Sequence, residues 1–85
     1  MRRQKHHDLA VLGRAVHELR ERRRLSESEV AAATGIDERR IQALETGQLD
    51  PDYVLLLALA KALGVTPVAL VTRAEELARE MPPDP

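Results

Sequence analysis

The residues whose types suggest chemistry are gathered in the segment 37–45. Arg39 is the foremost of them, because a guanidinium group forms two parallel hydrogen bonds to guanine O6 and N7 and so discriminates that base by ~1–3 kcal/mol. Glu38 can accept a hydrogen bond from cytosine N4, and Ala43 offers a methyl contact to thymine. On a helix these groups share an outer face, which we predict to contact base edges: Glu38, Arg39, Gln42 and Ala43.

Two short helices on either side of Gly35, one over about 27–34 and one that starts after Asp37 and ends near Thr46, are expected to position this face. An S-x-x-E capping box beginning at Ser26 starts the first helix. Gly35 can adopt the positive φ of a tight turn, and the small Ala31 lets the two helices cross closely at a steep angle. The second helix would then stand outward and fit a DNA major groove. Its apolar anchors would be Ile36, Ile41 and Leu44.

Three longer helices complete the expected fold. The first runs from Asp8, its N-cap candidate, to about Arg24, with apolar residues at spacings of three and four. Asp50-Pro51 gives an N-cap and a first helical residue for a helix that ends at Gly64, and Thr66-Pro67 gives the same signal for a helix over about 67–80. The middle helix is nearly apolar on all sides. We expect it to be covered by the first, third and last helices of the domain, or by a partner chain.

The composition fits one small all-α domain. The 85 residues are 44% hydrophobic with Tyr53 as the only aromatic residue, which suits a helical bundle better than a β-sandwich. The absence of cysteine excludes disulfide scaffolds and thiolate sites. The longest apolar run is too short to span a membrane, and no signal peptide is recognised, so a cytoplasmic protein is expected. We predict a flexible basic arm over 1–7, the helical domain over 8–80 and a proline-rich tail over 81–85.

The charge is unevenly distributed along the chain. Residues 1–24 hold eight basic and three acidic residues, whereas 25–50 and 51–85 carry net charges of −4 and −2. The net charge of −1 lacks the strongly basic balance of many nucleic-acid-binding domains. Any attraction for phosphates must therefore come from the N-terminal third. Its candidates include Arg2, Arg3 and Lys5 in the arm and the run Arg22–Arg24.

The two short helices and their neighbouring segments resemble the Cro/repressor-type (XRE) helix-turn-helix family. The resemblance covers about residues 9–71 and rests on several motifs in a fixed order: Leu19-Arg20-Glu21, Leu25-Ser26-x-x-Glu29-Val30-Ala31, Gly35-Ile36, Ile41-x-x-Leu44-Glu45-x-Gly47, Pro51 and Leu59-Ala60-x-Ala62-Leu63-Gly64-Val65. It implies a five-helix, lambda-repressor-like bundle whose third helix reads DNA. It also implies an ion pair between Arg20 and Glu45, in which the arginine often touches a phosphate.

The positions that contact the DNA backbone in the family carry over with departures. The candidate phosphate contacts are Arg20, Arg24, Ser26, Glu27 and Arg40. Glu27 stands where the family commonly has glutamine, and its charge has the wrong sign for a phosphate. Glu38 also departs from the small polar residues or glutamine expected there. Asp37 is harmless if it caps the helix, because backbone N–H groups then occupy its carboxylate.

Two functions remain open from the sequence. The first is a sequence-specific DNA-binding transcriptional regulator of bacterial or phage origin, a homodimer on double-stranded DNA that represses by occluding a promoter. The second is a protein-interaction module or antitoxin-type protein on the same fold, with weak or no DNA binding of its own. The residues show no nucleophile–base pair or paired carboxylates, and no residues complete a metal-ligand spacing with the three histidines. We therefore expect no enzyme activity, small-molecule substrate, cofactor or metal.

Overall fold

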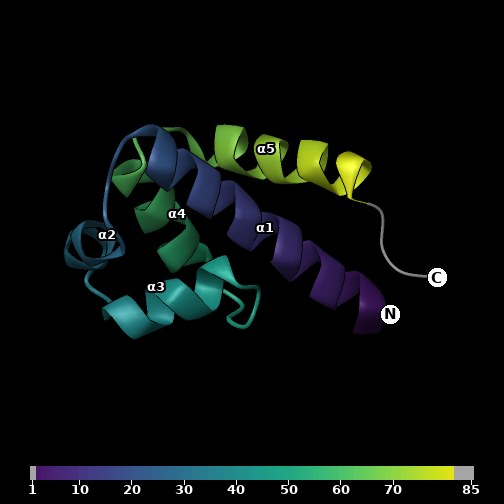
Figure 1. Ribbon diagram of the computed structural model, residues 1–85, viewed down its shortest axis with the longest axis horizontal. Helices are drawn as coiled ribbons and strands as arrows, with labels where there is room; N and C mark the ends of the chain where they lie inside the picture. The colour runs from purple at the N-terminus through teal and green to yellow at the C-terminus, as the bar shows by residue number, and fades with distance from the viewer. Residues whose placement is uncertain (1, 82–85) are drawn as a thin grey trace.

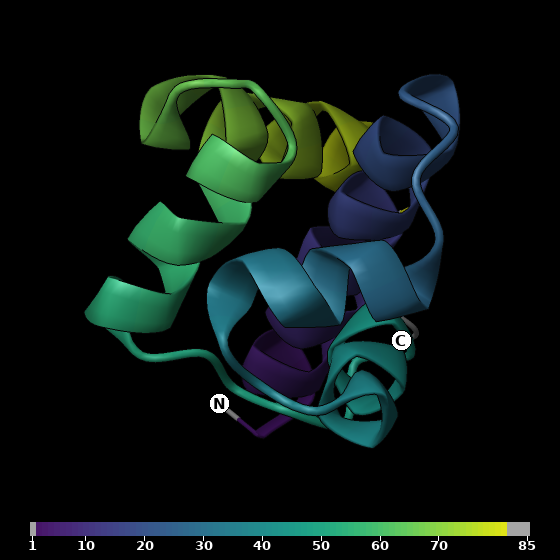
Figure 2. The same ribbon diagram turned by 90° about the vertical axis from the view of Figure 1, so that its left-hand side faces the viewer.

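The computed structural model describes the backbone of residues 2–81 and the side chains from Lys5 onward. This part of the chain contains five helices and no strand. In order, the helices are α1 (Arg2–Arg22), α2 (Glu27–Thr34), α3 (Glu38–Glu45), α4 (Tyr53–Ala62) and α5 (Pro67–Glu80). The long α1 runs diagonally through the molecule, with α5 along one side and α3 on the other (Figure 1). Seen from the end, α2 lies in front of α1 and packs against α3 and α4 (Figure 2). The all-α, five-helix prediction is confirmed.

Four helices begin at side chains that cap them, as backbone N–H groups in a first turn require. The predicted capping box is present, with Ser26 Oγ accepting from the Glu29 backbone and Glu29 accepting from the Ser26 backbone. The predicted caps Asp37 and Thr66 also hold, each accepting from the N–H three residues later. The prediction for α4 was two residues early, because Asp52 and not Asp50 accepts from the Leu55 N–H.

The prediction that residues 1–7 form a flexible arm is wrong for the part of it that is described. The helix α1 begins at Arg2, so Asp8 lies inside it and is not its N-cap. No glycine or proline interrupts residues 2–12, and arginine, glutamine and lysine favour helix, so the chain has no reason to break before Asp8. Lys5 also approaches Asp50 at 3.5 Å, beside the loop after α3. Residue 1 and the predicted tail residues 82–85 lie outside the described residues.

The core lies between the five helices, with α1 packed against α3 and α5, and α4 packed against α2 and α5. Its largest fully buried side chains come from every helix: Val16, Val30, Ile41, Leu44, Leu59, Leu63 and Leu70. The alternative in which the first, third and last helices cover α4 is wrong, because α4 packs mainly against α2 and α5 and leaves its first turn in solvent. Tyr53 and Val54 there are 72% and 73% exposed. Within residues 2–81, no single helix is long and apolar enough to cross a membrane, although α4 and α5 together, bent by 95°, pass by length and composition.

Candidate nucleic-acid interface

The turn between α2 and α3 places α3 on the outside of the molecule. Gly35 ends α2 with φ 78° and donates its N–H to the Ala31 carbonyl oxygen at 2.9 Å, and this left-handed conformation suits glycine. Ala31 is buried in the core at the α2 side of the turn. On α3, Ile41 and Leu44 are buried in the core, so the opposite side of this helix faces solvent.

The structure brings the four predicted base-contacting residues to the outer side of α3. Glu38, Arg39 and Gln42 are exposed, and Ala43 is half-buried. Arg40 is exposed beside them. Asp37, which lies at the N-terminal end of this face, accepts the Arg40 N–H at 2.8 Å. Its charge is therefore held by the helix terminus, as expected for a cap, and the two arginines extend from the same end of α3.

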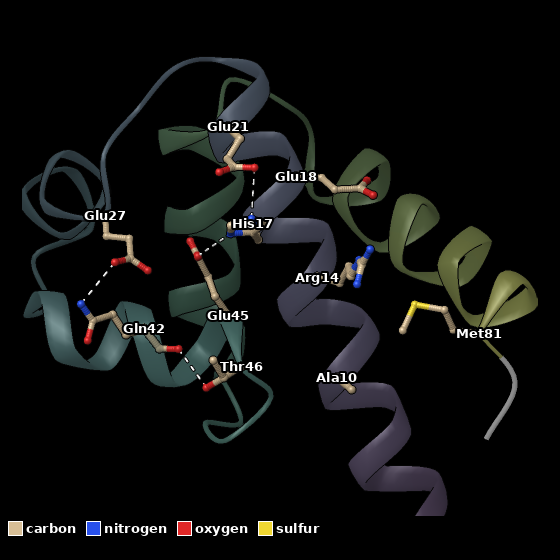
Figure 3. A pocket seen from close by; sticks show the side chains of 10 residues that line it. All are labelled: Ala10, Arg14, His17, Glu18, Glu21, Glu27, Gln42, Glu45, Thr46 and Met81. Carbon is tan, nitrogen blue, oxygen red and sulfur yellow. Dashed lines mark hydrogen bonds and ion pairs between the residues drawn. The ribbon is translucent and has the colours of Figure 1, made fainter. Parts of the chain in front are cut away.

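One contact links the start of α2 to this face. The Gln42 Nε2 group donates a hydrogen bond to Glu27 Oε1 across 3.2 Å (Figure 3). Gln42 is exposed and Glu27 is half-buried. The sequence analysis did not predict this contact, because the two residues are 15 positions apart and lie on different helices. A residue assigned to a phosphate and a residue assigned to a base are therefore partners of each other.

The pair that the family resemblance implied is present and is more extensive than a simple ion pair. Arg20 Nε and Nη2 donate to the two carboxylate oxygens of Glu45 at 2.6 and 3.0 Å. Arg20 Nη1 donates to the Leu25 carbonyl oxygen at 2.9 Å, in the loop that leads to α2. The side chains of Arg20 and Glu45 are only 11% and 5% exposed. Arg20 therefore holds α1, α3 and the α1–α2 loop together.

Burial alone raises the pKa of Glu45, but hydrogen bonds from Arg20 and His17 more than offset this effect, so the pKa of Glu45 lies below its ordinary value. The carboxylate is therefore ionised near neutral pH, and its charge is paired. His17 extends the same network, with Nδ1 3.0 Å from Glu45 Oε1 and Nε2 3.1 Å from Glu21 Oε1 (Figure 3). The sequence analysis did not connect His17 to Glu45, because they are 28 residues apart.

Gly13 is a second feature that the sequence analysis missed. A Cβ atom built on Gly13 would lie 2.4 Å from the Leu44 carbonyl oxygen and 2.7 Å from the Glu45 carbonyl oxygen. Both atoms belong to the backbone of α3, which cannot move aside as a flexible side chain could. The bare glycine therefore lets α1 approach the last turn of α3 closely. A glycine in the middle of a helical pattern is itself a signal of such an approach.

The predicted phosphate contacts differ in exposure and in how many of their hydrogen-bonding groups already have partners within the protein. Arg24 is exposed and has φ 57° in the turn after α1, while Ser26 is exposed but its hydroxyl oxygen caps α2. All three guanidinium nitrogens of Arg20 have partners within the chain, so Arg20 braces the fold and is less available to a phosphate than the exposed arginines. Arg24 and Arg40 remain the cationic candidates.

On the far side of α1, a separate ion pair fastens α5. Arg73 donates from Nε and Nη2 to the two carboxylate oxygens of Glu18 at 2.8 and 3.3 Å, and from Nη1 to Glu76 at 3.2 Å. These hydrogen bonds raise the pKa of Arg73 and lower the pKa of Glu18, so both groups stay charged. Over residues 2–81, no three histidine or acidic side chains come together as a metal site would require.

Comparison with known proteins places this geometry in a family. A family model described as a helix-turn-helix domain matches residues 11–79. The chain belongs to the helix-turn-helix family. The resemblance to Cro/repressor-type (XRE) helix-turn-helix proteins is thereby confirmed.

Relatives of this helix-turn-helix chain cover most of its length. It is 36% identical over 66 residues to an uncharacterized HTH-type transcriptional regulator, y4dJ, of Sinorhizobium fredii (strain NBRC 101917 / NGR234), which spans 78% of this chain and 86% of the relative. The restriction-modification controller protein C.AhdI from Aeromonas hydrophila is 35% identical with a TM-score of 0.72 and covers 74% of this chain and 96% of its own. The clp gene regulator ClgR of Corynebacterium glutamicum has the same fold, with a TM-score of 0.79 at 23% identity over 82% of this chain and 91% of its own.

Proposed function

We propose that this protein is a sequence-specific DNA-binding transcriptional regulator whose α3 enters the major groove of double-stranded DNA. The observation that carries the proposal is the exposure of Glu38, Arg39 and Gln42 on a helix whose opposite side is fixed in the core. The clamp of Arg20 on Glu45 gives α3 the rigid support that base recognition needs. The HTH-type transcriptional regulator y4dJ and the restriction-modification controller protein C.AhdI, each more than one-third identical to this chain, support the same role.

The side chains of this surface have different roles, which follow from their chemistry. Arg39 forms two hydrogen bonds to a guanine. Glu38 accepts a hydrogen bond from a cytosine, and Ala43 contacts the methyl group of a thymine. Arg24 and Arg40 bind backbone phosphates, which fixes the register of α3 on the duplex without reading sequence. Ser26 and Glu27 border the same backbone at the start of α2. We further propose that binding occurs in the cytoplasm and represses transcription by occluding a promoter.

Arg39→Ala and Arg24→Ala are expected to weaken DNA binding in different ways. Loss of Arg39 removes a base contact worth about 1–3 kcal/mol of discrimination, so preference should relax at one base pair while the salt dependence changes little. Loss of Arg24 removes a phosphate contact, so affinity should fall for all sequences and the slope of log K against log[salt] should flatten by about one. Titrations of a selected and a scrambled duplex over a salt series measure both effects.

Arg79→Ala is the matched control, because Arg79 is an exposed arginine in the last turn of α5, and α5 lies on the opposite side of α1 from α3 (Figure 1). It should leave base preference and the salt slope as they are in the wild type. If Arg39→Ala and Arg24→Ala bind every duplex as the wild type does, these two residues do not contact DNA and the assignment of the surface is wrong.

We also propose that the regulator binds as a homodimer, through the apolar side chains that α4 and the start of α5 leave uncovered. Tyr53, Val54 and Val68 are 72%, 73% and 74% exposed. Leu57 and Val71, about one helical turn further along α4 and α5, are 37% and 39% exposed. Apolar groups of this size at the surface mark interaction sites when they gather together. A second copy is the occupant that fits best, because two-fold symmetry would present two α3 helices to half-sites about one DNA turn, ~34 Å, apart.

Val68→Lys is expected to convert the dimer to a monomer, because it would bury an unpaired charge in the interface. Sedimentation equilibrium across a concentration series measures the change, and Ala32→Lys, at an exposed position on α2, is the control. A wild-type protein that stays monomeric at all concentrations would contradict the dimer. A dimer that persists in Val68→Lys would place the interface elsewhere.

A further inference from the structure

The hydrogen bond between Glu27 and Gln42 constrains a group that faces the proposed DNA surface. Gln42 lies on the outer side of α3 and is exposed, whereas its partner sits in the first turn of α2 and is half-buried. Within residues 2–81 Gln42 Oε1 accepts no hydrogen bond, so the side-chain amide is hydrogen-bonded to the protein only through its nitrogen. The backbone carbonyl of Gln42 is occupied separately, by the Thr46 hydroxyl at 3.0 Å (Figure 3).

The chemistry of Glu27 fixes which way this amide faces. An ionised carboxylate only accepts hydrogen bonds, so the Gln42 amide must turn its NH₂ group toward Glu27 and its oxygen away. One N–H of Gln42 is then occupied, and the free part of the amide is one acceptor oxygen beside one N–H donor. A glutamine at position 27 would not impose this choice, because its side chain both donates and accepts.

A donor beside an acceptor matches the major-groove edge of adenine, which presents N7 as an acceptor and N6–H₂ as a donor. Guanine presents two acceptors there, N7 and O6, and its O6 would face the oxygen of Gln42. We propose that Gln42 reads adenine and rejects guanine at one base pair, and that Glu27 is the positioning residue that fixes its amide. This inference rests on the proposed function. It also gives a role to an acidic residue whose charge opposes phosphate binding.

The test is Glu27→Gln, which preserves the size of the side chain and removes the constraint on the orientation of the amide. For the wild type, Gln42→Ala and Glu27→Gln, affinity is measured for a selected duplex and for duplexes with each base replaced in turn. Glu27→Gln should bind all duplexes more tightly, because a negative charge near the phosphates is gone. Its preference for adenine over guanine at the Gln42 position should nevertheless fall by roughly tenfold, a change of about 1.4 kcal/mol, and approach that of Gln42→Ala.

Asp50→Asn is the control for charge, since Asp50 lies in the loop after α3 and contacts Lys5 rather than Gln42. It should raise general affinity and leave the adenine-to-guanine ratio unchanged at every position. If the wild type binds DNA specifically but Glu27→Gln keeps every base ratio, this inference is overturned and the proposed function stands. If the wild type binds no DNA, the proposed function fails, and this inference falls with it.

Discussion

Gly13→Ala is expected to destabilise the fold by about 3 kcal/mol, a large effect for a single added methyl group. In the interior of a helix this substitution ordinarily stabilises by roughly 0.5–1 kcal/mol. Here the sign reverses, because the new Cβ would lie 2.4 Å from the Leu44 carbonyl oxygen of α3. For a domain of this size the melting temperature should fall by on the order of 10 °C or more. Thermal and urea unfolding followed by circular dichroism measure the change.

Gly35→Ala is the informative comparison, because an added Cβ there meets nothing within 4 Å and strains only a backbone at φ 78°. We expect a loss of roughly 1–2 kcal/mol from that backbone conformation alone. Gly13, inside α1, carries no such backbone strain, so any loss there comes from contact between helices. A Gly13→Ala protein as stable as the wild type would show that α1 and α3 do not approach as closely as described.

Arg20→Met is expected to cost about 3 kcal/mol or more of folding free energy at neutral pH. The substitution keeps most of the apolar stem, but it leaves the carboxylate of Glu45, 5% exposed, without its two hydrogen bonds from Arg20. It also removes the hydrogen bond to the Leu25 carbonyl oxygen. Arg14→Met is the control on the same helix, because Arg14 is exposed. The unfolding free energy of this variant should stay close to that of the wild type.

The pH dependence of this deficit checks its cause. The pKa of Glu45 lies below its ordinary value, so ionised Glu45 stabilises the fold above pH ~4.3, and the stabilisation is lost as the pH falls through the lowered pKa. Without Arg20, burial dominates and the pKa of Glu45 should rise. The difference between wild type and Arg20→Met should therefore be largest near neutral pH and shrink toward pH 3. A difference that stays constant over this range would assign the loss to packing instead.

Local signals in the sequence predicted the elements that carry the site. The capping box at Ser26 and the caps at Asp37 and Thr66 lie where expected, because each is decided by hydrogen bonds within four residues of chain. The start of α4 was misplaced because Asp50 and Asp52 flank Pro51, and either aspartate fits the local rule. The start of α1 was misplaced because a polar helical segment lacks the apolar periodicity on which the prediction rested.

The contacts that brace the site join residues distant in sequence, which local patterns do not encode. The Arg20–Glu45 pair came from the family resemblance, whereas the additional bonds of His17 and the contact of Gln42 with Glu27 came only from the structure. Gly13 is different, because its position within a helix already marked it as unusual. The outward direction of Arg39 was predictable, since buried Ile41 and Leu44 leave one side of α3 for solvent.

The central claim is that α3 reads DNA sequence, and the most direct test is an unbiased selection of duplexes from a random library with the purified full chain. We predict enrichment of a motif with two related half-sites about one helical turn apart, and we predict that Arg39→Ala loses the preference for one base pair in each half-site. If no sequence is enriched, or Arg39→Ala selects the same motif with the same stringency, α3 does not recognise DNA in the way described.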